Sequence, residues 1–168
     1  MEKVAILFGS STGNTESIAQ TLAEKIGENI AEAFNVSDFS VSRLAEYNNL
    51  ILGVSTLGIG AIQDHWKDFL PKLARADLNG KTIALFGLGD TESYPDTFVD
   101  GMGIVYEAIR KKGCTIIGQV DTIGYSFEHS GAVYEGKFIG LPLDEDNESE
   151  LTPSRIENWL NEITAKFI

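Results

Sequence analysis

Short runs of apolar and β-branched residues alternate along the chain with longer stretches in which apolar residues recur every three or four positions. The short runs are typical of buried strands and fall at residues 3–8, 30–36, 49–54, 81–86 and 115–120. The longer stretches predict helices at residues 15–27, 40–46, 63–74, 98–112 and 153–167. Thr152 is the expected N-cap of the last helix, with Pro153 as its first helical residue.

This alternation of strands and helices predicts one α/β domain over residues 1–168. Right-handed crossovers between strands that are apolar on both faces require a parallel sheet with helices on each side. The expected architecture is therefore a three-layer α/β/α sandwich around a five-stranded parallel sheet. A chain of 168 residues can bury such a core without a second domain.

One segment does not follow the alternation. Residues 121–135 carry glycines and aromatic residues without helical periodicity, and a strand pattern resumes only at residues 137–143. We expect this insertion to interrupt the fifth strand and to carry short antiparallel strands of its own. The insertion could bind a partner or have a purely structural role, and the sequence leaves both roles open.

The chain is strongly acidic, because 13 Lys and Arg stand against 25 Asp and Glu, for a net charge of −12 at pH 7. Such a surface repels nucleic-acid phosphates and anionic membranes and speeds encounter with proteins that carry basic patches, although solubility alone explains it equally well. No basic leader or long apolar span precedes the first strand, so a cytoplasmic location is expected. Cys114 is the single cysteine, which excludes an internal disulfide and predicts a buried, unreactive thiol.

A polar segment with two glycines, residues 9–15, connects the first strand to the first helix. Its hydroxyls and free backbone N–H groups would converge at the helix N-terminus, where they and the helix dipole favour a phosphate. The segment lacks the lysine of a triphosphate-binding loop and the three glycines of the dinucleotide pattern. Taken alone, it is equally compatible with an ordinary serine-rich helix cap.

Two more segments follow the third and fourth strands: residues 55–60, and residues 87–90 with their continuation 93–100. Because the carboxyl ends of parallel strands meet at one edge of a sheet, both should lie beside residues 9–15. With these three segments in this order, the chain resembles the flavodoxins over its whole length. The insertion and the tail at residues 143–147 resemble the long-chain branch of that family.

The resemblance implies the strand order 2-1-3-4-5 and one noncovalently bound FMN at the point where that order reverses, for which flavodoxin is the standard illustration. Residues 10–15 would hold the phosphate, Tyr94 would stack on the outer flavin face, and Asp146 would approach the ribityl chain. Backbone groups around Asp90, Thr97 and Val99 would meet the pyrimidine edge. The residues that the resemblance assigns to FMN are Ser10, Ser11, Thr12, Gly13, Asn14, Thr15, Ser55, Thr56, Leu57, Gly58, Ile59, Gly60, Leu88, Gly89, Asp90, Tyr94, Thr97, Phe98, Val99 and Asp146.

Leu57 departs from the family pattern, since many flavodoxins have tryptophan on the inner flavin face, and Asn14 stands where some have lysine. Inner-face stacking is therefore expected to be absent: Leu57 would still exclude water from the ring, but an aromatic pair that contributes about 1 kcal/mol beyond area burial is lost. Gly58 lies where a peptide must turn if its carbonyl is to accept a hydrogen bond from the flavin nitrogen protonated on one-electron reduction. Glycine reaches positive φ at little cost, which predicts a stabilised neutral semiquinone.

No lysine or arginine occurs in the three segments, whereas Asp90, Asp100 and Asp146 add negative charge. One charge about 8 Å from the ring costs about 2 kcal/mol at an effective dielectric constant of about 20. For a one-electron step this is about 90 mV. A low potential for the second reduction is therefore expected.

The expected function is that of a low-potential one-electron carrier, a monomer without a substrate of its own. Its partners would be redox proteins with basic docking faces, such as a ferredoxin-NADP reductase-like donor and a low-potential acceptor. One alternative is an FMN enzyme of the same fold, such as a quinone reductase, which would need space beside the ring that Tyr94 should close. Another is a protein-binding module that has lost FMN, which only Leu57 favours.

No metal site is expected. His65 and His129 lack metal-ligand spacing, and the acidic run 144–150 lacks the alternation and the glycine of a calcium loop. We interpret this run as a solvated patch that faces partners.

Overall fold

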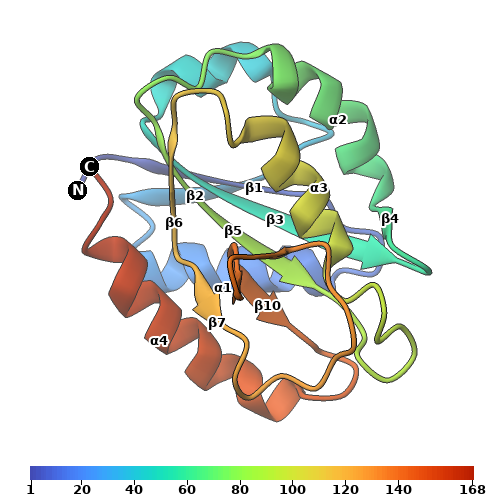
Figure 1. Cartoon of the computed structure of the whole chain (residues 1–168). Coiled ribbons are helices and arrows are strands. Elements are labelled where there is room, and N and C mark those ends of the chain that lie inside the picture. Colours follow the sequence, from blue (N-terminus) through green and yellow to red (C-terminus); the bar gives the residue numbers. More distant parts are fainter.

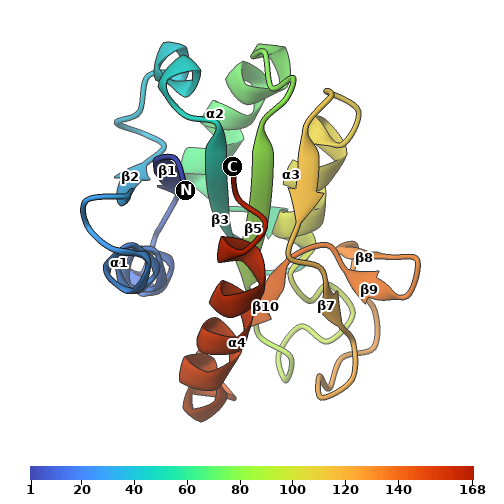
Figure 2. The same cartoon turned by 90° about the vertical axis from the view of Figure 1, so that its left-hand side faces the viewer.

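A parallel sheet runs through the centre of the computed structural model, which describes residues 1–168, and helices cover both of its faces (Figures 1 and 2). Four strands lie in the order β2-β1-β3-β5. Their bounds are Val4–Phe8 for β1, Ala31–Asn35 for β2, Asn49–Leu57 for β3 and Thr82–Leu88 for β5. All neighbours in this row pair in parallel, as the alternation of elements in the sequence predicts.

The fifth position of the sheet is shared by two short strands, which confirms the predicted interruption. β6 (Thr115–Ile117) pairs with the first half of β5, and β10 (Leu141–Leu143) pairs with the second half, both in parallel. The chain between them forms a separate antiparallel sheet in the order β7-β9-β8, from Val120–Asp121, Lys137–Phe138 and Val133–Tyr134. With β6 and β10 counted as one position, the order is 2-1-3-4-5.

Each face of the sheet has its own apolar core. Side chains alternate along every strand, so Leu7 packs toward α2 (Asp64–Arg75) and α3 (Asp100–Ile109), whereas Ile6 packs toward α1 (Asn14–Ile26) and α4 (Thr152–Thr164). Figure 2 shows α1 and α4 together on one side of the sheet. Burial on both faces explains why the strands are continuous apolar runs.

Three helix predictions differ from the structure. The helix expected at residues 40–46 is a 3-10 helix, η1 (Val41–Glu46), and α3 begins at Asp100, because Val99 adopts left-handed backbone angles (φ 50°). The predicted N-cap at Thr152 is wrong. A 3-10 turn, η2 (Ser149–Leu151), runs directly into α4, so Thr152 is already helical and its hydroxyl donates to Glu145 instead.

Candidate functional site

Residues 9–13 form a tight loop between β1 and α1. The Ser10 hydroxyl accepts a hydrogen bond from the Gly13 amide (3.0 Å), and Gly13 has φ 92°, which favours glycine. No side chain caps α1, so the amides of Asn14, Thr15 and Glu16 have no acceptor within the protein. Uncapped amides at a helix N-terminus are the donor set that a phosphate requires.

Gln63 fixes this loop from α2, a contact that the sequence does not reveal. Its side chain is 1% exposed and caps α2 by accepting from the amides of His65 (3.0 Å) and Trp66 (3.3 Å). Its amide nitrogen donates to the Ser11 hydroxyl (3.1 Å). A side chain at Gly9 would come 2.1 Å from the Gln63 oxygen, so glycine is needed there for Gln63 to reach the loop.

A cavity of about 370 Å³ opens beside the loop at the carboxyl edge of the sheet. Thirteen of the twenty residues assigned to FMN from the sequence line it, so the structure brings most of the three segments together. They are Ser11, Thr12, Asn14, Thr15, Ser55, Thr56, Leu57, Gly58, Leu88, Gly89, Asp90, Tyr94 and Asp146. Glu145 also lines the cavity and was not among the expected residues.

The segment after β3 is a hairpin rather than a plain loop. β3 continues to Leu57 and pairs with β4 (Ala61–Ile62), which leaves Gly58, Ile59 and Gly60 in the turn. Gly58 has φ 50° and no atom near the position of a Cβ, so its peptide has space to change orientation. Ile59 is 87% exposed and Gly60 packs against Asp100, so neither lines the cavity.

Thr97, Phe98 and Val99 were also assigned to FMN from the sequence but do not line the cavity. Phe98 and Val99 are buried in the core, where Phe98 packs against Phe127 and Phe138 at ring distances of 5.9 and 6.0 Å. Phe98 and Val99 therefore offer only backbone groups, whereas the half-buried Thr97 has a hydroxyl without a hydrogen-bond partner. The Val99 amide has no acceptor within the protein and lies beside Gly89, where an added Cβ would approach it to 3.0 Å.

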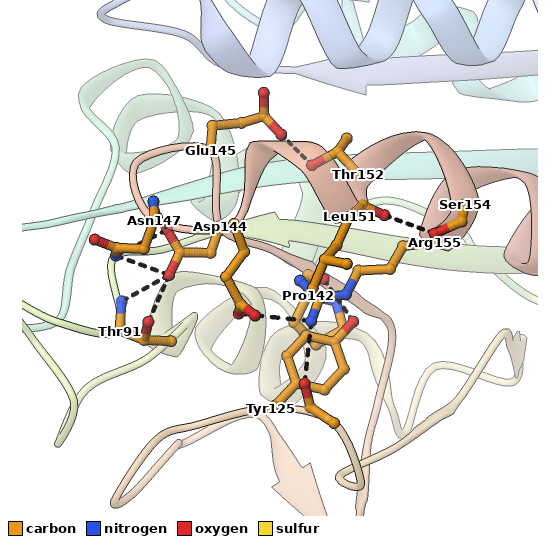
Figure 3. Close-up of polar contacts among 12 residues, drawn as sticks. Thr91, Tyr125, Pro142, Asp144, Glu145, Asn147, Leu151, Thr152, Ser154 and Arg155 are labelled. Carbon is orange, nitrogen blue, oxygen red and sulfur yellow. Dashed lines mark hydrogen bonds and ion pairs between the residues drawn. The ribbon is translucent and has the colours of Figure 1, made fainter.

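A buried carboxylate ties together the two loops that carry the acidic residues of the cavity (Figure 3). Asp144 is 0% exposed, which corrects the interpretation of residues 144–150 as a uniformly solvated patch. It accepts hydrogen bonds from the amide (3.0 Å) and hydroxyl (2.6 Å) of Thr91, and from the amide (3.0 Å) and side chain (2.9 Å) of Asn147. The Asn147 side chain also donates to Asp90 (2.8 Å), so the network fixes both loops relative to each other.

The cavity is lined by carboxylates and by no cationic side chain. Burial opposes ionisation of Asp90, but hydrogen bonds from Ser93 and Asn147 outweigh it and lower its pKa. The pKa of Asp146 is raised by burial and by the negative charges of Asp90 and Asp144. Neutral amides and hydroxyls must therefore hold any phosphate here, and further negative charge in the cavity is disfavoured.

No group of three His, Cys, Asp or Glu side chains is arranged to hold a metal ion. Cys114 is half-buried and donates to the Ile109 carbonyl, and burial raises the pKa of its thiol. No helix is both long enough and apolar enough to cross a membrane.

The fold and this site define a class: a doubly wound α/β protein with a phosphate-type ligand site at the point where the strand order reverses. The family model "Flavodoxin" matches residues 6–159, and the chain belongs to the flavodoxin family. It is 41% identical over 168 residues to flavodoxin 1 of Salmonella typhimurium, and the alignment covers 99% of this chain and 96% of that protein. It is 39% identical over 166 residues to a flavodoxin of Nostoc sp., which covers 99% and 98%.

A solved structure gives the same result. The flavodoxin of Fusobacterium nucleatum bound to flavin mononucleotide superimposes with a TM-score of 0.94 at 33% identity, over 100% of both chains. Membership of the long-chain branch stays a prediction.

Proposed function

We propose that this chain binds one FMN noncovalently and carries single electrons at low potential between larger redox proteins. The observation that carries the proposal is the uncapped start of α1 beside the cavity. The amides of Asn14, Thr15 and Glu16 have no acceptor within the protein there and are free to bind an anion. The flavodoxin of Fusobacterium nucleatum with its bound flavin mononucleotide supports FMN as that ligand.

The residues of the cavity suit this cofactor. The loop at residues 10–15 supplies donors for the phosphate, Leu57 and Tyr94 supply walls for a flat ring, and the free Val99 amide lies near the place expected for the polar edge. Bound FMN supplies one-electron redox chemistry. The protein's part is to exclude water, to hold the ring, and to place the Gly58 peptide and the acidic residues around it.

The charges favour a low potential for the second electron. Asp90, Glu145 and Asp146 line the cavity without a compensating lysine or arginine, so each added negative charge is opposed. The same acidity, −12 over the chain, supports docking to partners with basic faces, such as a ferredoxin-NADP reductase-like donor and a low-potential acceptor. We propose that the carrier acts as a monomer in the cytoplasm.

A carrier also fits the size of the cavity better than an enzyme. Ligand pockets measure about 300–1,000 Å³, and 370 Å³ lies near the lower limit. We therefore propose that the cavity takes the flavin without a second substrate beside it. No observation favours the alternative of a quinone reductase.

Anaerobic stepwise reduction of the purified, FMN-saturated chain tests the proposal. We expect two separate one-electron waves and no steady consumption of NAD(P)H by the protein alone. A single two-electron wave, or sustained NAD(P)H oxidation with a quinone, would contradict the carrier function. A chain that takes up no FMN would contradict the whole proposal.

A further inference from the structure

A second cavity lies at the opposite edge of the sheet from the candidate FMN site. Its volume is about 640 Å³, compared with 370 Å³ for the cavity at residues 10–15. It lies between η1 and the C-terminal end of α2, next to Lys81, which immediately precedes β5. The length of β5 separates the two cavities by about 20 Å, at about 3.3 Å per residue.

Three cationic side chains line this cavity, although the chain as a whole carries −12. They are Lys72, Arg75 and Lys81, and none of them takes part in an ion pair of the structure. Salt at physiological strength screens exposed charges beyond about 8 Å, so this local cluster outweighs the distant acidic surface. Asp77 is the single carboxylate in the lining.

Lys81 carries the strongest argument, because it is only 7% exposed. Its ammonium donates to the carbonyl oxygens of Leu44 (2.8 Å) and Tyr47 (2.6 Å), which are neutral acceptors. The positive charge therefore has hydrogen bonds but no direct ion pair. Burial lowers the pKa of Lys81, partly offset by Asp77, as expected for an ammonium that still lacks a counter-ion.

The rest of the lining indicates the kind of anion. Val41, Leu44 and Ala76 provide apolar wall, and Ser42 and Asn79 provide neutral polar groups. A cation cluster next to an apolar wall, in a volume within the range of ligand pockets, fits a molecule with a charged phosphate group and a less polar body. Inorganic phosphate alone would leave most of the cavity unfilled.

We propose that this cavity binds an anionic phosphate ester of nucleotide size, with its phosphates on Lys72, Arg75 and Lys81 and its body against Val41, Leu44 and Ala76. The site is independent of the FMN proposal, since it shares no residue with the other cavity.

The probe is ADP, titrated calorimetrically into the full chain after it has been loaded with FMN and freed of unbound FMN, so that the loop at residues 10–15 is occupied and no free FMN competes for the second cavity. We expect saturable binding that weakens as salt is raised, with amide NMR shifts at residues 41–47 and 75–81. Adenosine should not bind, and pyrophosphate should bind more weakly than ADP. Shifts confined to residues 10–15, equal binding of adenosine, or no saturable ADP binding would overturn the proposal.

The variant Lys72→Gln/Arg75→Gln leaves the buried Lys81 and its cap of η1 intact. It should weaken ADP binding at least about tenfold, equivalent to about 1.4 kcal/mol. The matched control is Lys67→Gln/Lys111→Gln, which removes two exposed cations outside the cavity and should leave ADP affinity within about twofold. Equal weakening by both double variants would show a general charge effect and overturn the site.

Discussion

Replacing Asp144 by alanine should loosen both loops that bring acidic residues to the candidate FMN site. The carboxylate is fully buried and accepts from four donor groups, two on Thr91 and two on Asn147 (Figure 3). Hydrogen bonds to a charged group contribute about 1.5–3 kcal/mol each. If water replaces the carboxylate as acceptor for two of these four donors, the free energy of unfolding falls by about 3–6 kcal/mol.

The conservative variant Asp144→Asn separates the lost hydrogen bonds from the lost side chain. One oxygen of Asp144 accepts from three donors and the other from two, so an amide oxygen in the first position retains part of the network. The free energy of unfolding of Asp144→Asn should therefore lie between the values for wild type and Asp144→Ala. Glu150→Ala, which removes an exposed carboxylate without a hydrogen bond, is the control and should change stability by less than about 0.5 kcal/mol.

The assay is urea denaturation of the protein without FMN, followed by titration of each variant with FMN. Because Thr91 follows Asp90 and Asn147 follows Asp146, we expect Asp144→Ala to weaken FMN binding at least about tenfold. Unchanged stability and affinity in Asp144→Ala would refute the argument that this buried carboxylate holds the cavity together.

Three further outcomes are expected. Leu57→Trp should tighten FMN binding about fivefold by fluorescence titration, since an aromatic pair adds about 1 kcal/mol, and weaker binding would mean that the wall has no space for an indole. Asp146→Asn should raise the potential of the second reduction step, as measured by spectroelectrochemistry. For a charge about 8 Å from the ring, the expected rise is about 20 mV if water screens the charge fully and about 90 mV at an effective dielectric constant of about 20. An unchanged potential would exclude this charge as a contributor. Folding lowers the pKa of Asp90, so the ionised carboxylate stabilises the fold fully above the unfolded pKa of about 3.9, and this stabilisation disappears as the pH falls through the folded pKa. Asp90→Asn should therefore lose less stability than wild type when the pH is lowered in denaturation experiments. Parallel curves of stability against pH for the two proteins would contradict this.

The sheet and the loop at its first strand could be predicted because the sequence signals of both are local. Apolar runs mark each strand, and the loop at residues 9–15 occupies one continuous segment between a strand and a helix. The interrupted fifth strand was also visible, since glycines and aromatic residues without periodicity separate its two halves.

The contacts that hold the loops around the cavity in place could not be predicted, because they join distant parts of the chain. Gln63 reaches Ser11 across 52 positions, and Asp144 reaches Thr91 across 53. Within the acidic run, nothing in the sequence separates the buried Asp144 from the exposed Asp146, since aspartate is usually exposed. The start of α3 was misplaced because the left-handed turn at Val99 has no sequence signal in a β-branched residue.

The most direct test compares FMN with riboflavin, which lacks the phosphate, in fluorescence titrations of the protein freed of flavin. If the uncapped amides of residues 14–16 bind that phosphate, FMN should bind at least about 100-fold more tightly, equivalent to about 2.7 kcal/mol. Equal affinities for the two flavins would show that the loop does not hold the phosphate.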